Sequence, residues 1–421
     1  MIIKLENLNV FINNTLIKQD LYLENGIIRY NLSNYDRVIK GDYIVIPGIT
    51  DLHTHLRERG FEYKETISTA NKAALKGGVN TVFAMPNLNP TCDSLKTLKK
   101  QEEIYKEADI KIKQFVAITK KQEGKELTDI DNIAKYNRFF SDDGKGVQSE
   151  AMMFEAMKYV AKNNGIISAH CEDESELTTN ACIHLGKKSK EFNLIGISSK
   201  SEYLQIERDL KLAKLTKCHY HVDHISTRQG VDLVRKAKSK GIKVTAEVTP
   251  HHLLLSENDI KENDGKYKMN PPLRSEEDRI ALIQGIIDGT IDVIATDHAP
   301  HSKKEKETTF DKAKFGVVGI EFAFDLLYEN LVKKKIITLS KLIQLMTINP
   351  TTIFNLESNT ITEGKLANIA IFDLNSSRFI RKETILSKGK STCFEGRHLS
   401  SECVMNIIDG EIKYEKENLN A

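Results

Sequence analysis

The middle of the chain alternates between short apolar runs and longer amphipathic stretches, and this alternation limits the possible folds more than any other feature. The apolar runs lie at residues 43–49, 81–85, 112–118, 138–141, 165–170, 219–222, 243–248 and 292–297. Stretches with apolar residues at helical spacing separate them, for example at 150–163, 202–215 and 228–240. Strand and helix signals in alternation are typical of parallel strands joined by crossover helices. We therefore predict an α/β fold built on a (β/α)8 TIM barrel.

Both ends of the chain have a different pattern from the middle. Residues 1–48 contain short β segments separated by Asn and Gly, and this pattern returns at 367–374 and 404–412. Alternating residues with such breaks are typical of hairpins. We expect one small β domain built from both termini, with residues 1–48 as its N-terminal part, 49–357 as the barrel and 358–421 as its C-terminal part.

The charge balance argues against nucleic acid or a membrane as a partner. The 421 residues include 61 Lys and Arg and 59 Asp and Glu, which gives a net charge of +2 and no strong global field. No stretch approaches the roughly 18 to 20 apolar residues that span a bilayer, and the amino terminus lacks the pattern of a signal peptide. We expect a cytoplasmic protein. The six cysteines form no Cys-x-x-Cys pair, so a metal ion would be held by nitrogen and oxygen ligands.

Histidines and carboxylates collect at the ends of the expected strands, namely His53, His55, Asp142, Asp143, His170, His224 and Asp297. A barrel brings the carboxyl ends of its strands to one face, where catalytic groups gather. Taken singly, each of these residues is more often structural, for example an aspartate that caps a helix. Taken together they supply ligands for two divalent ions with a bridging carboxylate. Imidazole and carboxylate ligands without thiolate suit zinc, with manganese or cobalt as alternatives.

Such a centre points to hydrolysis of an amide, or to the reverse reaction. Two close metal ions lower the pKa of a shared water and polarise a carbonyl, and Asp297 is placed to move a proton. Arg57 and Asn87 end the first two expected strands and could clamp a carboxylate through charge-assisted hydrogen bonds. Asn270 and His301 are further candidates for substrate contact.

A series of motifs along the chain resembles, in order and with compatible spacing, the class I bacterial dihydroorotases of the amidohydrolase superfamily. The motifs begin with Asp51-Leu52-His53-Thr54-His55-Leu56-Arg57 and continue at 85–87, 142–144, 170–173, 224–227, 247–252, 269–274 and 297–301. The resemblance implies the reversible cyclisation of N-carbamoyl-L-aspartate to (S)-dihydroorotate, in de novo pyrimidine (UMP) biosynthesis.

The resemblance also implies roles for individual residues. Two zinc ions per subunit would be held by His53, His55 and Asp297 on one side and by His170 and His224 on the other. Asp143 would bridge them, as in the aspartate-bridged branch of the family, with Lys145 as a rival for that place. Asp297 would be the catalytic acid and base. Seven positions would contact the substrate: His55, Arg57, Asn87, Asn270, His301, Phe315 and Gly316.

The expected partner is a small-molecule substrate, N-carbamoyl-L-aspartate or dihydroorotate. The resemblance alone suggests a homodimer, and it leaves an association with aspartate transcarbamoylase open. One alternative is another cyclic amidohydrolase, such as an allantoinase, hydantoinase or dihydropyrimidinase. Those relatives usually keep a bridging lysine and, without an exocyclic carboxylate on their ring, have no equal need for Arg57 with Asn87. The other alternative is a non-catalytic partner of aspartate transcarbamoylase.

Overall fold

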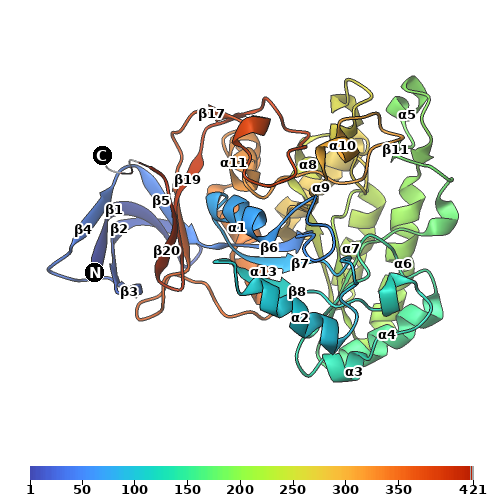
Figure 1. The fold of residues 1–421 in the computed structure, drawn as a ribbon, viewed down its shortest axis with the longest axis horizontal. Helices are drawn as coiled ribbons and strands as arrows, with labels where there is room; N and C mark the ends of the chain where they lie inside the picture. The colour runs from blue at the N-terminus through green and yellow to red at the C-terminus, as the bar shows by residue number, and fades with distance from the viewer. Residues whose placement is uncertain (418, 420–421) are drawn as a thin grey trace.

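Both ends of the chain meet in one β-sheet that lies beside a larger, helix-covered body (Figure 1). The computed structural model describes residues 1–417 and 419. In the order of the chain, the strands of the terminal sheet are β1 (Ile2–Ile12), β2 (Thr15–Glu24), β3 (Ile27–Arg29), β4 (Arg37–Lys40), β5 (Tyr43–Pro47), β16 (Ile369–Asp373), β19 (Glu402–Ile408) and β20 (Glu411–Glu415).

The pairing of β5 with β16 joins the two ends of the chain. These strands run antiparallel, with Val45 opposite Ile371, and both side chains are fully buried in a core shared by residues of the two termini. The small β domain built from both termini is therefore confirmed. Within residues 358–421, Ile380, Ile385 and Phe394 pack instead against a core cluster of the barrel body. The boundaries at residues 48 and 357 stay a prediction, and residues 418, 420 and 421 lie outside the described part.

Eight parallel strands form the barrel: β6 (Ile49–Thr54), β7 (Val79–Ala84), β8 (Lys111–Gln114), β9 (Phe139–Phe140), β10 (Ile166–Ala169), β13 (His219–Val222), β14 (Val244–Val248) and β15 (Val293–Ile294). They pair as a three-stranded and a five-stranded sheet. Parallel bridges from Val116 to Phe140 and from Thr54 to His298 join the two sheets at both edges. The strands thus close on themselves, and the predicted (β/α)8 barrel is confirmed.

Helices surround these strands, and a serine or threonine directly precedes each of the seven longest helices in the described residues. They are α1 (Ile67–Lys76), α2 (Leu95–Tyr105), α4 (Glu150–Lys162), α6 (Ser199–Thr216), α7 (Arg228–Ser239), α9 (Glu276–Asp288) and α12 (Leu339–Met346). In each case the side chain of the preceding Ser or Thr accepts a hydrogen bond from an amide of the first turn. Such caps satisfy donors that a helix leaves unpaired at its start.

Shorter elements occupy the connections and the C-terminal segment. They are α3 (Ile130–Ile133), β11 (Ile183–His184), α5 (Lys187–Glu191), β12 (Gly196–Ile197), α8 (Pro250–Leu254), α10 (Lys303–Lys306), α11 (Ala323–Leu327), α13 (Ile348–Ile353), β17 (Arg378–Phe379) and β18 (His398–Leu399). Among the helices of residues 1–417 and 419, none combines the length and apolarity needed to cross a bilayer.

The apolar run 43–49 differs from the expectation, because it does not form one barrel strand. Residues Tyr43–Pro47 belong to the terminal sheet, and the first barrel strand is Ile49–Thr54, so that His53 lies within a strand and not after it. The chain changes sheets at Gly48, where an added Cβ would lie 2.1 Å from the side chain of Asn80. Only glycine leaves room for that contact, and the apolar run alone does not reveal the change.

Asp51 links the first and last strands of the barrel and should therefore matter for stability. Its carboxylate accepts hydrogen bonds from the Thr296 amide at 2.9 Å and from the Thr296 hydroxyl at 2.5 Å, and Asp51 is 2% exposed. Asp51→Ala should lower the free energy of unfolding by about 2–3 kcal/mol, because buried donors lose their acceptor. Urea unfolding at pH 7 measures this. The exposed Glu357→Ala should change it by less than about 0.5 kcal/mol; equal losses in both variants would contradict the role of Asp51.

Candidate metal centre and active site

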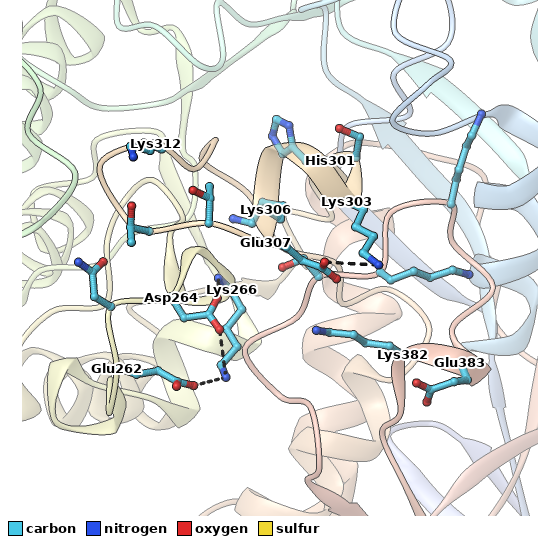
Figure 2. Close-up of a pocket in the computed structure, with 17 residues that line it drawn as sticks. Glu262, Asp264, Lys266, His301, Lys303, Lys306, Glu307, Lys312, Lys382 and Glu383 are labelled. Carbon is cyan, nitrogen blue, oxygen red and sulfur yellow. Dashed lines mark hydrogen bonds and ion pairs between the residues drawn. The ribbon is translucent and has the colours of Figure 1, made fainter.

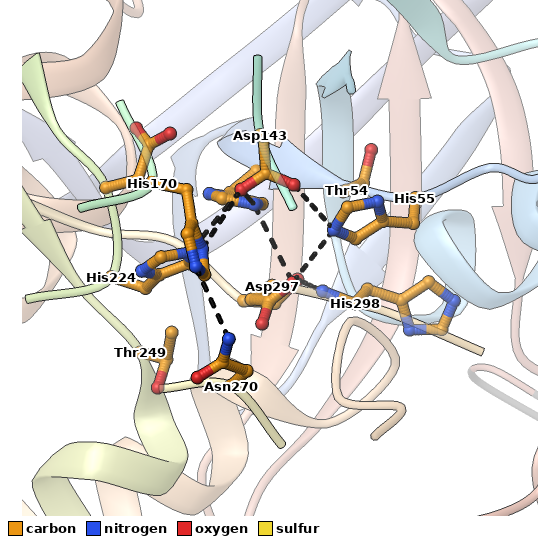
Figure 3. A network of polar contacts seen from close by, with 12 residues as sticks. Thr54, His55, Asp143, His170, His224, Thr249, Asn270, Asp297 and His298 are labelled. Carbon is orange, nitrogen blue, oxygen red and sulfur yellow. Dashed lines mark hydrogen bonds and ion pairs between the residues drawn. The ribbon is translucent and has the colours of Figure 1, made fainter. Parts of the chain in front are cut away.

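Asp143, just after β9, lies among the side chains of four histidines, of which Figure 3 labels His55, His170 and His224. Its Oδ1 is 3.4 Å from His53 Nε2, 3.4 Å from His224 Nε2 and 3.7 Å from His170 Nδ1. Its Oδ2 is 3.3 Å from His55 Nε2. All five residues are buried. Burial alone would raise the pKa of Asp143, but the neighbouring histidines, His53 first, hold it well below its usual range.

The barrel brings these side chains together from strands far apart in the sequence. His53 lies in β6 and His55 follows it, while His170 and His224 follow β10 and β13. His224 has a φ of 29° and Asp297, beyond β15, a φ of 46°, so the backbone turns sharply behind both side chains. A non-glycine residue in this left-handed region costs about 1–3 kcal/mol, and such residues cluster at functional sites.

Asp297 supplies a second carboxylate to the same group. Its Oδ1 lies 3.2 Å from His55 Nε2 and 3.7 Å from His53 Nε2. Burial raises the pKa of Asp297, but His55 and the other nearby histidines outweigh it and keep the carboxyl ionised. Ligand atoms of His53, His55 and Asp297 lie within 4.8 Å of one another, and the same holds for those of His53, Asp143 and His224.

The hydrogen bonds around His53 test whether these residues fit a metal ion. Its Nδ1 lies 2.7 Å from Glu247 Oε1, and an ionised carboxylate only accepts, so Nδ1 carries the proton. In the neutral ring, the lone pair of Nε2 then faces the oxygens of Asp143 and Asp297. His53 Nε2 and Asp143 Oδ1 are buried without a hydrogen-bond partner among the described residues. A cation between these acceptors removes the conflict, so the donor set fits a divalent metal ion.

A buried arginine, Arg57, lies on the opposite side of the site. Arg57 is buried, its Nε donates to the Pro300 oxygen at 3.2 Å, and its Nη2 lies 3.4 Å from His301 Nε2. His301 Nε2 in turn lies 2.6 Å from the Phe315 oxygen, to which it donates. Burial lowers the pKa of Arg57 to about 10, so its charge persists at neutral pH. Burial and Arg57 lower the pKa of His301 to about 2, which leaves a neutral ring.

Two asparagines of the site contact histidines that surround Asp143. Asn87 Oδ1 lies 2.9 Å from His55 Nδ1, and Asn270 Nδ2 lies 3.4 Å from His170 Nε2. Asn270 also donates to Glu172 Oε1 at 3.1 Å. Each asparagine thus orients a histidine that faces Asp143, a task that their sequence positions do not reveal.

One cavity of about 240 Å³ collects these residues. Its walls include the metal-ligand and substrate-contact residues expected from the sequence except His53, which is fully buried behind them. Gly144, Ala299 and Lys314 also line it and were not expected. Lys145, the rival for the bridging place, is exposed and does not line the cavity. Asp142 accepts hydrogen bonds from the amides of Ile118 and Thr119 instead.

A larger cavity of about 810 Å³ adjoins the first at His301 (Figure 2). Lysines outnumber carboxylates in its wall, which includes Lys266, Lys303, Lys306, Lys312, Lys382, Lys388, Lys390, Glu262, Asp264, Glu307 and Glu383. Lys306 is 2% exposed, and its Nζ donates to the oxygens of Lys268 and Lys314 at 2.9 Å each. These bonds hold the segment before Phe315 and so fix one wall of the smaller cavity.

Solved structures share this architecture. The model is similar to an L-hydantoinase (dihydropyrimidinase) from Arthrobacter aurescens, with a TM-score of 0.88 and 22% identity, covering 98% of this chain and 96% of that one. It is also similar to a dihydropyrimidinase from Brevibacillus agri, with a TM-score of 0.85 and 20% identity, covering 99% and 95%. At this identity the likeness concerns the fold alone, and it agrees with the predicted fold class.

Sequence comparison is more specific. A family model described as dihydro-orotase-like matches residues 42–230. Curated relatives named dihydroorotase, from Bacillus cytotoxicus and Bacillus thuringiensis, are 46% identical over 411 and 410 residues, with 96% of this chain and of each relative covered. Identity at this level over almost the whole length, together with the buried cluster around Asp143, shows that the chain belongs to the dihydroorotase family.

Proposed function

We propose that this protein is a dihydroorotase, which interconverts N-carbamoyl-L-aspartate and (S)-dihydroorotate in de novo pyrimidine biosynthesis. The observation that carries the proposal is the placement of Asp143 among four inward-facing histidines, with a buried arginine across the same 240 Å³ cavity. The cluster of Asp143 and histidines suits hydrolysis at a metal centre, and the buried arginine suits a substrate with a carboxylate.

We assign two zinc ions to the centre, one held by His53, His55 and Asp297 and one by His170 and His224, with Asp143 between them. Bound there, the ions would supply Lewis-acid chemistry, lowering the pKa of a water and polarising a carbonyl. The ring nitrogens that would bind them are already directed at Asp143. Imidazole and carboxylate ligands suit zinc, with manganese or cobalt as alternatives.

Asp297 is the group to which we assign proton transfer. It lines the cavity and is held ionised by His55 and the other histidines, so it can accept a proton. In the ring-opening direction it takes a proton from the attacking water and passes it to the departing ring nitrogen; in cyclisation the path reverses.

The substrate carboxylate would lie against Arg57, Asn87 and His301. A guanidinium can bind a carboxylate through two parallel hydrogen bonds, and burial strengthens that contact. Asn270, Phe315 and Gly316 would contact the rest of the ring. The excess of lysines in the adjoining cavity also favours an anionic substrate.

The second candidate is a hydantoinase or dihydropyrimidinase, as the two solved structures are named. Those proteins share about 20% identity with this chain, against 46% for the relatives named dihydroorotase. A cytoplasmic location, a homodimer and an association with aspartate transcarbamoylase stay predictions.

Turnover of L-dihydroorotate by the zinc-supplemented protein tests the function. Opening of the ring should be seen as a loss of absorbance, and removing metal with a chelator should abolish it until zinc is restored. Allantoin, hydantoin and dihydrouracil, which lack the exocyclic carboxylate, should react at least about tenfold more slowly, since each loses a charge-assisted contact with Arg57. Faster turnover of any of these three would favour the second candidate.

Asp297→Asn should lower kcat for dihydroorotate by about 10²–10⁴, because the amide cannot accept the proton. Most of the zinc should remain, since Asp143 and four histidines are unchanged. Steady-state kinetics and metal analysis of the same preparation measure both quantities. A variant that keeps most of its turnover would show that another group moves the proton.

Arg57→Lys should raise KM for dihydroorotate about tenfold or more, because a lysine keeps the charge but loses the paired hydrogen bonds. The control is Arg59→Lys, since Arg59 lies two residues away and does not line the 240 Å³ cavity. Its KM should stay within about twofold of the wild-type value. Equal KM values for the two variants would remove Arg57 from the substrate site.

A further inference from the structure

Glu247 connects the metal-facing His53 to a second buried histidine. Its Oε1 lies 2.7 Å from His53 Nδ1, and its Oε2 lies 3.3 Å from His221 Nε2. Glu247 is 1% exposed and both histidines are fully buried. The three side chains come from three strands, β14, β6 and β13. One carboxylate therefore fixes the ring orientation of histidines on both sides of it.

The contacts continue along the inside of the barrel. His221 Nδ1 lies 2.8 Å from Thr245 Oγ1, and the same oxygen lies 3.0 Å from His219 Nε2. Tyr220, between the two histidines in β13, points the other way, and its hydroxyl donates to Asp209 of α6. Since alternate residues of a strand face opposite sides, His219, His221 and their partners in β14 face the barrel interior.

The proton donors and acceptors in this chain of contacts determine which ring nitrogen of His53 donates to Glu247. Ionised Glu247 accepts hydrogen bonds from His53 Nδ1, from His221 Nε2 and, at 3.4 Å, from the amide of His224. His221 Nδ1 then accepts from the Thr245 hydroxyl. In this arrangement the neutral ring of His53 carries its proton on Nδ1 and presents the lone pair of Nε2 to Asp143 and Asp297, which is the form of imidazole that binds a metal ion.

We propose that Glu247, supported by His221 and Thr245, is a positioning residue for the metal centre, which holds His53 in its metal-binding tautomer and orientation. The inference rests on the metal centre of the proposed function. Glu247 does not line the 240 Å³ cavity, and it contacts the metal-facing group through the ring of His53 and the backbone amide of His224. A carboxylate behind a metal-binding histidine also raises the basicity of the ring.

Zinc affinity of the full-length protein, measured by competition with a chromophoric chelator, tests this proposal without any substrate. Glu247→Gln keeps the shape of the side chain but removes its charge, and it should weaken zinc binding about 10- to 100-fold. The absorption spectrum of the cobalt-loaded variant should shift as well, because the first ligand is no longer held in place. The control is Asp209→Asn, which removes a fully buried carboxylate on the opposite face of β13; its zinc affinity and cobalt spectrum should match the wild type.

Unchanged zinc affinity and an unchanged cobalt spectrum in folded Glu247→Gln would overturn the proposal, as would an equal loss in Asp209→Asn. If Glu247→Gln does not fold, His221→Gln takes its place and should weaken zinc binding at least about threefold, and unchanged binding there would also overturn it. A wild-type protein that binds two zinc ions but does not open dihydroorotate would refute the proposed function and leave this inference intact.

Discussion

The whole site depends on one electrostatic constraint, a buried carboxylate that four imidazoles approach at once. Asp143 carries a charge that would be costly to bury alone, so it demands several polar neighbours, and the surrounding histidines hold its pKa well below the usual range. The barrel meets that demand because it delivers the four histidines from the ends of three different strands, around a fourth strand that carries Asp143. The Asp51–Thr296 bonds contribute by holding the first and last of the eight strands together.

Much of this arrangement could be predicted from the sequence, because it follows from periodicity. Alternating strand and helix signals predict a barrel, and residues at strand ends must then converge. The side-chain contacts that could not be predicted from the sequence depend on the register between strands. Glu247 lies in a recognisable motif, but its contact with His53 requires knowing how β14 faces β6. The apolar run 43–49 has a similar limit, since a continuous apolar run does not say that its two parts join different sheets. Phe315 and Gly316 were expected only through family resemblance.

The C-terminal segment between β16 and β19 has a role that composition did not suggest. Glu65, which is fully buried in the barrel body, accepts hydrogen bonds from the Ser387 hydroxyl and from the Lys388 amide. The same carboxylate lies 3.5 Å from His298 Nε2, next to Asp297. Residues of the C-terminal segment thereby stabilise the loop that carries the assigned proton-transfer group. Glu65 is the side chain that contacts both the C-terminal segment and this loop.

The left-handed backbone at Arg57, His224 and Asp297 sets a limit on how this protein can be engineered. The φ angles of these residues are 63°, 29° and 46°. Glycine would relieve the strain at each of them, and design methods that reward relaxed geometry would select it there. The same change deletes the guanidinium, the imidazole or the carboxylate to which we assign substrate binding, metal binding and proton transfer. Thermostabilised variants should therefore be sought at other positions, because a glycine at any of these three would raise stability and lower activity together.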